Sequence, residues 1–493
     1  MAGQRNRSQS LSKSVAWLYH ESGIASLYLT GRDAWLIILS RTCRMFSFGA
    51  VSLTIALFFS ELGFSDFQIG LFMTLTLLGD VVLGLVITLM ADGLGRRRVM
   101  FAGGLLMAVS GLAFSIMENF WILLFAAVVG VVSASGGDFG PFRAIEESML
   151  SHITTPKTRA DVLSWYVTSS SLGSAVGMEL AGRYVESMKS REGWTMLRAY
   201  HATFWIYIAT GLFSMVLALC MSSKCEVEKT PETLDESTQG LLDDSQQGNE
   251  DLDPVNSQQP SVAPPKNRFS QISSNTRSVM YKLWFLLAVD SLADGMVSYT
   301  LTTYFLHRKF QLSKTTLGDI MSAAFLLGTI STVAAVPLSR HLGLLNTMVF
   351  THLPSSVAVL LFPAPSGLIL TVILLYVRMG LNTMDQAPRA AFIAAVVKPE
   401  ERTAVMGITS TVRTLAMAIG PSLTGALAGS DRFWIAYVVG GTLRIMYDLG
   451  LWAMFVNMRL HAHETNHQDV GPQRESIDEE TVVMQPQPRE QEA

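Results

Sequence analysis

The sequence predicts an all-α polytopic membrane protein that is built from two bundles of six transmembrane helices each. Of its 493 residues, 49% are hydrophobic and only 15% are charged, whereas about a quarter of a typical soluble domain is charged. The apolar residues gather into runs of about 20, which is the length that a helix needs to cross a bilayer. A long polar stretch divides these runs into two equal sets, and this division predicts the two bundles.

Twelve apolar runs are expected to form the transmembrane helices. Tryptophans mark several of their ends, as is common where a helix meets the membrane interface; these are Trp35, Trp121, Trp284 and Trp434. In chain order, the runs lie near residues 34–60, 66–91, 98–117, 121–148, 161–186, 202–222, 281–305, 315–337, 345–363, 366–394, 403–428 and 434–458. The first six runs predict one bundle over residues 34–222, and the last six predict another over residues 281–460.

Three polar segments lie outside the bundles. Residues 1–33 form an N-terminal tail that lacks the apolar core of a cleaved signal peptide. The linker at 223–280 and the tail at 461–493 are rich in polar residues, and we expect both to be disordered. Basic residues in the tails and the linker favour a cytosolic location for both termini. The protein is therefore expected to be a multi-pass protein of the plasma membrane or the vacuolar membrane.

The two predicted bundles share a repeated segment. Aligning residues 156–182 with residues 399–425, without gaps, gives nine identities in 27 positions. The shared Gly-x-x-x-x-Gly spacing suits helices that pack closely in lipid, where small residues form the interface. The identities are Pro156/Pro399, Arg159/Arg402, Val162/Val405, Thr168/Thr411, Leu172/Leu415, Ala175/Ala418, Gly177/Gly420, Leu180/Leu423 and Gly182/Gly425. The repeat predicts two bundles that are related by a pseudo-two-fold axis.

The loop at residues 91–98, between the second and third runs, has the sequence Ala-Asp-Gly-Leu-Gly-Arg-Arg-Arg. Its three arginines indicate that the loop lies at a water interface. Its Asp-x-x-Gly-Arg-Arg pattern resembles the signature loop between helices 2 and 3 of the major facilitator superfamily (MFS). The alternative interpretation is an ordinary cytosolic turn in which the arginines only follow the positive-inside rule.

The resemblance covers nearly the whole membrane part. It implies the MFS fold, with twelve transmembrane helices in two bundles and a substrate site at the midplane between them. It also implies a role in conformational gating for Asp92, Gly95, Arg96 and Arg97. In that family the glycine permits a tight turn, the aspartate braces the facing bundle, and the arginines face anionic lipid.

Four arginines within the predicted helices are the candidate substrate-binding residues: Arg44, Arg143, Arg389 and Arg413. Ionisable side chains are costly to place in a bilayer, and they usually face a cavity or one another. Arg413 is the strongest candidate because it lies ten residues past the basic cytosolic region. Arg44 lies about 13 Å into its helix, and a position outside the cavity is the alternative for this residue. A guanidinium group matches the geometry of a carboxylate or a phosphate.

Four aspartates are the candidates for proton coupling: Asp138, Asp290, Asp294 and Asp385. The segment around Asp138, Gly-Gly-Asp-Phe, partly resembles the helix-4 signature of phosphate:proton symporters, in which the aspartate helps to handle substrate and proton. Asp290 and Asp294 are four residues apart and share one helix face, where two carboxylates repel each other and favour proton binding. The alternative for Asp290 and Asp294 is a hydrated position near the cytosolic end. The alternative for the aspartates of the fourth and tenth helices is a structural Asp–Arg pair that holds the cytosolic gate shut.

These observations favour a secondary active transporter that moves a small anionic or polar solute, with protons, by alternating access. The sequence has no Walker loop, CxxC pair or HExxH motif, so we expect no enzyme activity, no metal site and no cofactor. The expected partners are a small-molecule substrate, protons and the lipid bilayer, with no nucleic acid, and the chain is expected to be a monomer. An efflux carrier for drugs or amphipathic metabolites is the first alternative, although Gly177 is followed by Met178 where drug antiporters usually have proline. A membrane sensor or receptor is the second.

Overall fold

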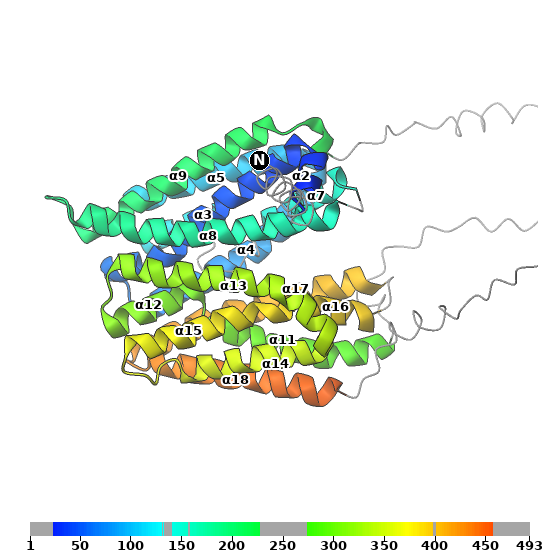
Figure 1. Cartoon of the computed structure of the whole chain (residues 1–493). Helices are drawn as coiled ribbons and strands as arrows, with labels where there is room; N and C mark the ends of the chain where they lie inside the picture. The colour runs from blue at the N-terminus through cyan, green and yellow to red at the C-terminus, as the bar shows by residue number, and fades with distance from the viewer. Residues whose placement is uncertain are drawn as a thin grey trace, which may run out of the picture.

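The structure is a computed structural model of the whole chain, and it describes residues 23–130, 132, 141–155, 158–226, 274–397 and 401–456. The regular elements among these residues are all helical. They form two bundles that lie against each other along one side (Figure 1). The prediction of an all-α protein in two halves is confirmed.

The N-terminal half begins with a short helix inside the predicted tail. Its elements are α2 (Ile24–Thr30), α3 (Arg32–Glu61), α4 (Asp66–Leu94), α5 (Arg96–Ile116), α6 (Phe120–Val129), α7 (Pro141–Ile153), α8 (Arg159–Lys189), α9 (Met196–Cys220) and the 3-10 turn η1 (Ser223–Cys225). The prediction of one helix over 121–148 was wrong in its extent, since this region contains the separate helices α6 and α7. The turn η1 lies in the region that was predicted to be a disordered linker, yet Cys225 is buried.

The C-terminal half also contains interrupted helices. Its elements are α11 (Ser274–Met296), α12 (Tyr299–Phe310), α13 (Lys314–Leu342), α14 (Leu344–Leu361), α15 (Leu368–Asn382), η4 (Thr383–Asp385), α16 (Gln386–Val396), α17 (Arg402–Gly429) and α18 (Phe433–Phe455). The predicted seventh helix divides between α11 and α12, and the tenth divides at η4. Helix α11 begins before the predicted boundary at residue 281. Among the described residues, six helices are long and apolar enough to cross a membrane by length and composition, and the number of crossings stays a prediction.

The surface and interior have the polarity expected of a protein in lipid. Large apolar side chains such as Phe125 and Ile369 are 70% and 78% exposed, whereas the arginines Arg41 and Arg444 are almost completely buried. In water such a surface would be costly, because apolar area exposed to water is unfavourable. In a bilayer the lipid tails cover it, and the charged groups compensate one another in the interior.

The repeated glycines explain how the halves are joined. Gly177 on α8 and Gly420 on α17 each pack against the first long helix of their own half, where an added Cβ would lie 1.9 Å from Phe46 O and 2.3 Å from Met296 N. Gly182 and Gly425, five residues later, pack against the opposite half, on α13 and α4 respectively. The sequence repeat therefore corresponds to a repeated packing arrangement, as the pseudo-two-fold axis requires.

The halves are joined mainly at one end of the molecule. We call this the distal end; it carries residues 62–65, 190–195, 311–313 and 430–432, whereas the described chain begins and ends at the opposite, terminal end (Figure 1). One hydrophobic core spans both halves at the distal end and includes Phe59 and Leu301. At the terminal end, each half has a separate core, one around Met149 and Tyr166 and the other around Leu283 and Phe392.

Polar contacts reinforce the distal joint. Arg308 on α12 donates to Asp66 on α4 at 2.5 Å, and Arg183 on α8 donates to Asp319 on α13 at 3.2 Å. The side chain of Glu186 accepts from the backbone N–H at the start of α13. The shared core and these contacts close the distal end, whereas the separate cores leave the halves less tightly joined at the terminal end.

Candidate functional site

Charged side chains gather in the middle of the C-terminal half. They come from six helices and from the η4 interruption, so they are far apart in sequence but close in space. The residues are Asp290 and Asp294 on α11, His352 on α14, Asn382 on α15, Asp385 on η4, Arg389 on α16, Arg413 on α17, and Arg444 and Asp448 on α18. We call these nine residues the C-half network.

An arginine outside this network stabilises the break between α11 and α12. Helix ends leave backbone carbonyls without partners, and the carbonyl of Val297 lies at such an end. The guanidinium of Arg378 on α15 donates to this carbonyl and to the hydroxyl of Thr302, the latter at 3.1 Å. Arg378 is thus bound to backbone and hydroxyl groups and holds the interrupted helix in position.

Arg389 lies between two aspartates of the C-half network. Its guanidinium is 2.6 Å from Asp385, one helical turn earlier, and 3.6 Å from Asp290 on α11. All three side chains are buried. A buried charge is tolerated when it has a partner of opposite sign, so this triad joins α11 to the broken tenth helix. The sequence analysis named all three residues, and the structure brings them together.

Arg444 forms the other centre of the network. Its guanidinium donates to the carboxylate of Asp294 and to the amide oxygen of Asn382, and it is 2.7 Å from His352 Nε2. The opposite ring nitrogen of His352 is 2.7 Å from Asp448. The sequence analysis missed Arg444, His352 and Asp448, although the four-residue spacing of Arg444 and Asp448 within an apolar run was a visible signal.

The structure changes the reasoning about Asp290 and Asp294. They were predicted to repel each other, but each faces a different arginine: Asp290 lies near Arg389, and Asp294 contacts Arg444. Each carboxylate thus has a guanidinium within ion-pair distance, and this attraction stabilises both of them. Asp294 is 22% exposed, which makes it more accessible than Asp290.

Arg413 differs from the other arginines of the network. Its Nε donates to the hydroxyl of Ser291 at 3.2 Å, and its side chain is partly exposed. Among the residues that the structure describes, no carboxylate forms an ion pair with it. Within the described part of the chain, the terminal nitrogens of this guanidinium, at the middle of α17, have no hydrogen-bond partner.

A smaller charged cluster lies in the N-terminal half. Arg44 is 2.6 Å from the buried carboxylate of Glu146, and Arg41 is 3.6 Å from the same group. The hydroxyl of Tyr166 donates to Glu146 at 2.8 Å. Arg143 instead pairs with Glu147 at 2.7 Å, and both are about 40% exposed. Of the four candidate substrate-binding arginines, Arg44 and Arg143 thus lie in the N-terminal half, whereas Arg389 and Arg413 belong to the C-half network.

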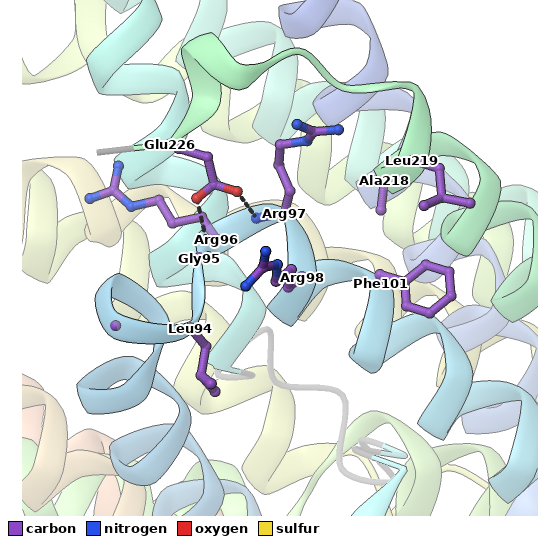
Figure 2. Close-up of a pocket in the computed structure, with 10 residues that line it drawn as sticks. Leu94, Gly95, Arg96, Arg97, Arg98, Phe101, Ala218, Leu219 and Glu226 are labelled. Carbon is purple, nitrogen blue, oxygen red and sulfur yellow. Dashed lines mark hydrogen bonds between the residues drawn. The ribbon is translucent and has the colours of Figure 1, made fainter. Parts of the chain in front are cut away.

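The predicted gating loop has a partner that the sequence analysis missed. Gly95 has a φ of 95°, a conformation that favours glycine, and it allows α5 to begin directly after α4. The backbone N–H groups of Arg96 and Arg97 donate to the carboxylate of Glu226 at 2.7 and 3.1 Å (Figure 2). Glu226 thus caps α5, and the two arginines line a pocket with a volume of about 550 Å³. The side chain of Asp92 lies outside the described residues.

Comparisons with known proteins identify the family. The family model of the Major Facilitator Superfamily matches residues 37–275 and 283–484. The chain belongs to the major facilitator superfamily. An uncharacterized membrane protein of Saccharomyces cerevisiae, YJR124C, is 32% identical over 432 residues, which cover 87% of this chain and 95% of that protein.

Solved structures of this superfamily share the fold. The nucleoside transporter NupG has a TM-score of 0.64 and 12% identity, with coverage of 86% of this chain and 99% of that chain. A D-xylose-proton symporter has a TM-score of 0.63 and 12% identity, over 85% and 98% of the two chains. The family match makes the chain a membrane transporter and not an enzyme, as the sequence predicted. Asp138, with the partial symporter signature around it, lies outside the described residues.

Proposed function

We propose that this transporter moves a small anionic solute together with protons by alternating access. The observation that carries the proposal is the position of Arg413, a guanidinium in the middle of a transmembrane helix without a carboxylate partner among the described residues. Guanidinium groups bind carboxylates and phosphates in a bidentate manner. An anionic substrate would provide the missing partner at this position.

The charge balance supports coupling to protons. The sequence analysis did not include Arg444 and Asp448. The middle of the C-terminal half contains four arginines and four aspartates, which balance: Arg378, Arg389, Arg413 and Arg444, and Asp290, Asp294, Asp385 and Asp448. One bound proton makes this set positive, and a positive, poorly hydrated region attracts anions. Proton and anion would then favour each other's binding, and this linkage is reciprocal.

The arrangement of the halves supports alternating access. The distal end is closed by a core and by ion pairs that span the halves. With the predicted topology, in which both termini are cytosolic, this conformation faces the cytosol. The plasma or vacuolar membrane location, the cytosolic termini, the monomeric state and the gating role of Asp92, Gly95, Arg96 and Arg97 stay predictions. The D-xylose-proton symporter shares the fold, so this architecture is compatible with proton symport.

The test is a thermal-shift screen of the purified protein against carboxylates, phosphate esters and inorganic phosphate, followed by uptake of each hit into proteoliposomes. A ligand that binds the folded state raises its stability. We expect hits among anions, uptake that requires a proton gradient, and loss of affinity in Arg413→Gln. Arg413→Lys should lose less affinity because it keeps the charge but lacks the planar fork.

The control is Arg191→Gln, a change in an exposed distal loop, which should leave binding and uptake unchanged. Proton-driven uptake of an anion with wild-type affinity in Arg413→Gln would contradict the assignment of Arg413. Transport of a bulky organic cation, unaffected by Arg413→Gln, would instead support the efflux alternative.

A further inference from the structure

His352 occupies a position in the C-half network where it contacts a cation and an anion at the same time. It lies in the middle of α14 and is 2% exposed. Its Nδ1 is 2.7 Å from an oxygen of Asp448, and its Nε2 is 2.7 Å from a guanidinium nitrogen of Arg444. The same Nε2 is 3.7 Å from an oxygen of Asp290.

These contacts determine the protonation state of the ring in this conformation. A guanidinium can only donate hydrogen bonds, so Nε2 of His352 must accept from Arg444 and carries no hydrogen. The carboxylate of Asp448 accepts, so Nδ1 carries the hydrogen. Ser356 donates to the second oxygen of Asp448 at 2.7 Å and holds that carboxylate in place. The imidazole is therefore neutral, with one defined lone pair on Nε2.

We propose that His352 is the proton-binding group of this transporter, and that protonation of Nε2 exchanges its contact with Arg444 for a contact with Asp290. This inference rests on the proposed proton-coupled function. In the step, a hydronium ion transfers a proton to the Nε2 lone pair and leaves water, and the hydrogen bond from Arg444 breaks because two donors cannot face each other. The imidazolium then has Asp448 on one side and Asp290 on the other.

This exchange of contacts at His352 would also change the charge around Arg413, the proposed substrate-binding arginine, because Asp290 interacts electrostatically with both residues. Asp290 is 3.6 Å from Arg389, and the next residue, Ser291, accepts from Arg413. A closer approach of Asp290 to His352 draws it away from Arg389 and leaves more uncompensated positive charge beside Arg413. The ionisable groups that surround His352 or are linked to it through these contacts are Asp290 and Asp294 on α11, Asp385 on η4, Arg389 on α16, and Arg444, Tyr447 and Asp448 on α18.

The position of His352 distinguishes it from the aspartates as the proton acceptor. Asp294 and Asp385 each already have an arginine in direct contact, and a proton there would break an ion pair without a new one forming. Protonation of His352 instead creates a cation between two carboxylates. Histidine is also the side chain whose ordinary titration range falls near physiological pH.

The direct test is solid-state NMR of the full-length protein in lipid, with ¹⁵N-labelled histidine, over a range of about pH 4 to 9. The His352 signals are assigned by their loss in His352→Asn, or by their shift in Ser356→Ala if the first variant does not fold. We expect a neutral ring with the hydrogen on Nδ1 at high pH and a doubly protonated ring at low pH. A ring that stays neutral throughout this range would overturn the proposal.

A second measurement tests whether this proton controls the conformation. Spin labels at Glu192→Cys and Ala364→Cys, in exposed distal loops of the two halves, report opening of the distal end. All variants carry His307→Gln, which removes another titrating histidine near the joint. We expect a pH-dependent distance distribution that His352→Asn abolishes.

The matched control is His201→Asn. His201 is a partly buried histidine of the N-terminal half, and its ring contacts the backbone carbonyl of Phe114 in the same half. This variant should retain the pH response. A response that survives His352→Asn would contradict the proposal. If the ring titrates and the pH response is lost in His352→Asn, but no anion binds in the thermal-shift screen, the proton site stands and the proposed substrate class fails.

Discussion

Replacing Gly182 or Gly425 by alanine should open the distal end of the transporter. A Cβ at Gly182 would lie 2.3 Å from Lys314 O, and a Cβ at Gly425 would lie 2.5 Å from Asp66 O. Both neighbours are backbone atoms of the opposite half, so the strain can be relieved only by moving the halves apart. Overpacking by a methyl group typically costs about 1–3 kcal/mol.

This strain exists only while the distal end is closed, so it should act on the conformational equilibrium. A cost of about 1–3 kcal/mol changes the ratio of closed to open molecules about 5- to 150-fold. The assay is the distance distribution between spin labels at Glu192→Cys and Ala364→Cys, in protein whose native cysteines have been replaced. We expect Gly182→Ala and Gly425→Ala each to increase the population with the longer distance.

Two comparisons make this prediction specific. Gly367→Ala, also at the distal end, has no atom within 4 Å of its added Cβ and should leave the distances unchanged. Gly177→Ala and Gly420→Ala introduce clashes within one half, so they should lower thermal stability without favouring the open distal end. A wild-type distance distribution in both Gly182→Ala and Gly425→Ala would refute the reasoning.

Three further predictions concern single contacts. Arg378→Met should lower the free energy of unfolding by about 1–3 kcal/mol, because the buried carbonyl of Val297 loses its partner; an unchanged thermal denaturation curve would contradict this. Burial and the neighbouring Lys314 ammonium lower the pKa of His307 below its ordinary 6.5. His307 therefore binds a proton more weakly while the distal end is closed, and the closed end should lose stability as the pH falls through 6.5. His307→Gln should remove that part of the pH response of the spin-label distances. Glu226→Gln should weaken the cap of α5 by about 1 kcal/mol, which hydrogen exchange at the start of α5 would detect as faster exchange.

Much of the fold was predictable because it depends on composition and spacing. The apolar runs located the helices, and the identities between 156–182 and 399–425 led to the paired glycines at the joints. The breaks at 297–298 and 383–385 were not predictable, since neither contains proline or a pair of glycines. Their stability depends on distant groups, as with Arg378 at the first break.

Part of the candidate site was also predictable from the sequence pattern. Arg389, Arg413, Asp290 and Asp385 were found because each is a charge inside an apolar run. His352 was missed because it is often neutral and its importance comes from contacts with other helices. Glu226 was missed because its polar surroundings predicted a disordered linker, whereas its role comes from the α5 backbone.

The C-half network also has a consequence for how the protein is made. Helices α11 and α18 are not among the six that are long and apolar enough to cross a membrane by composition, and they carry Asp294 and Arg444. A lone charge in lipid is unfavourable, so neither helix is expected to be stable in the bilayer without the other. Because α18 follows the other described helices of its half in the chain, Asp294 has no contact with Arg444 until nearly the entire half has been translated. A nascent chain that stops before α18 would therefore expose an uncompensated acid in the membrane, a feature that quality-control proteases could recognise.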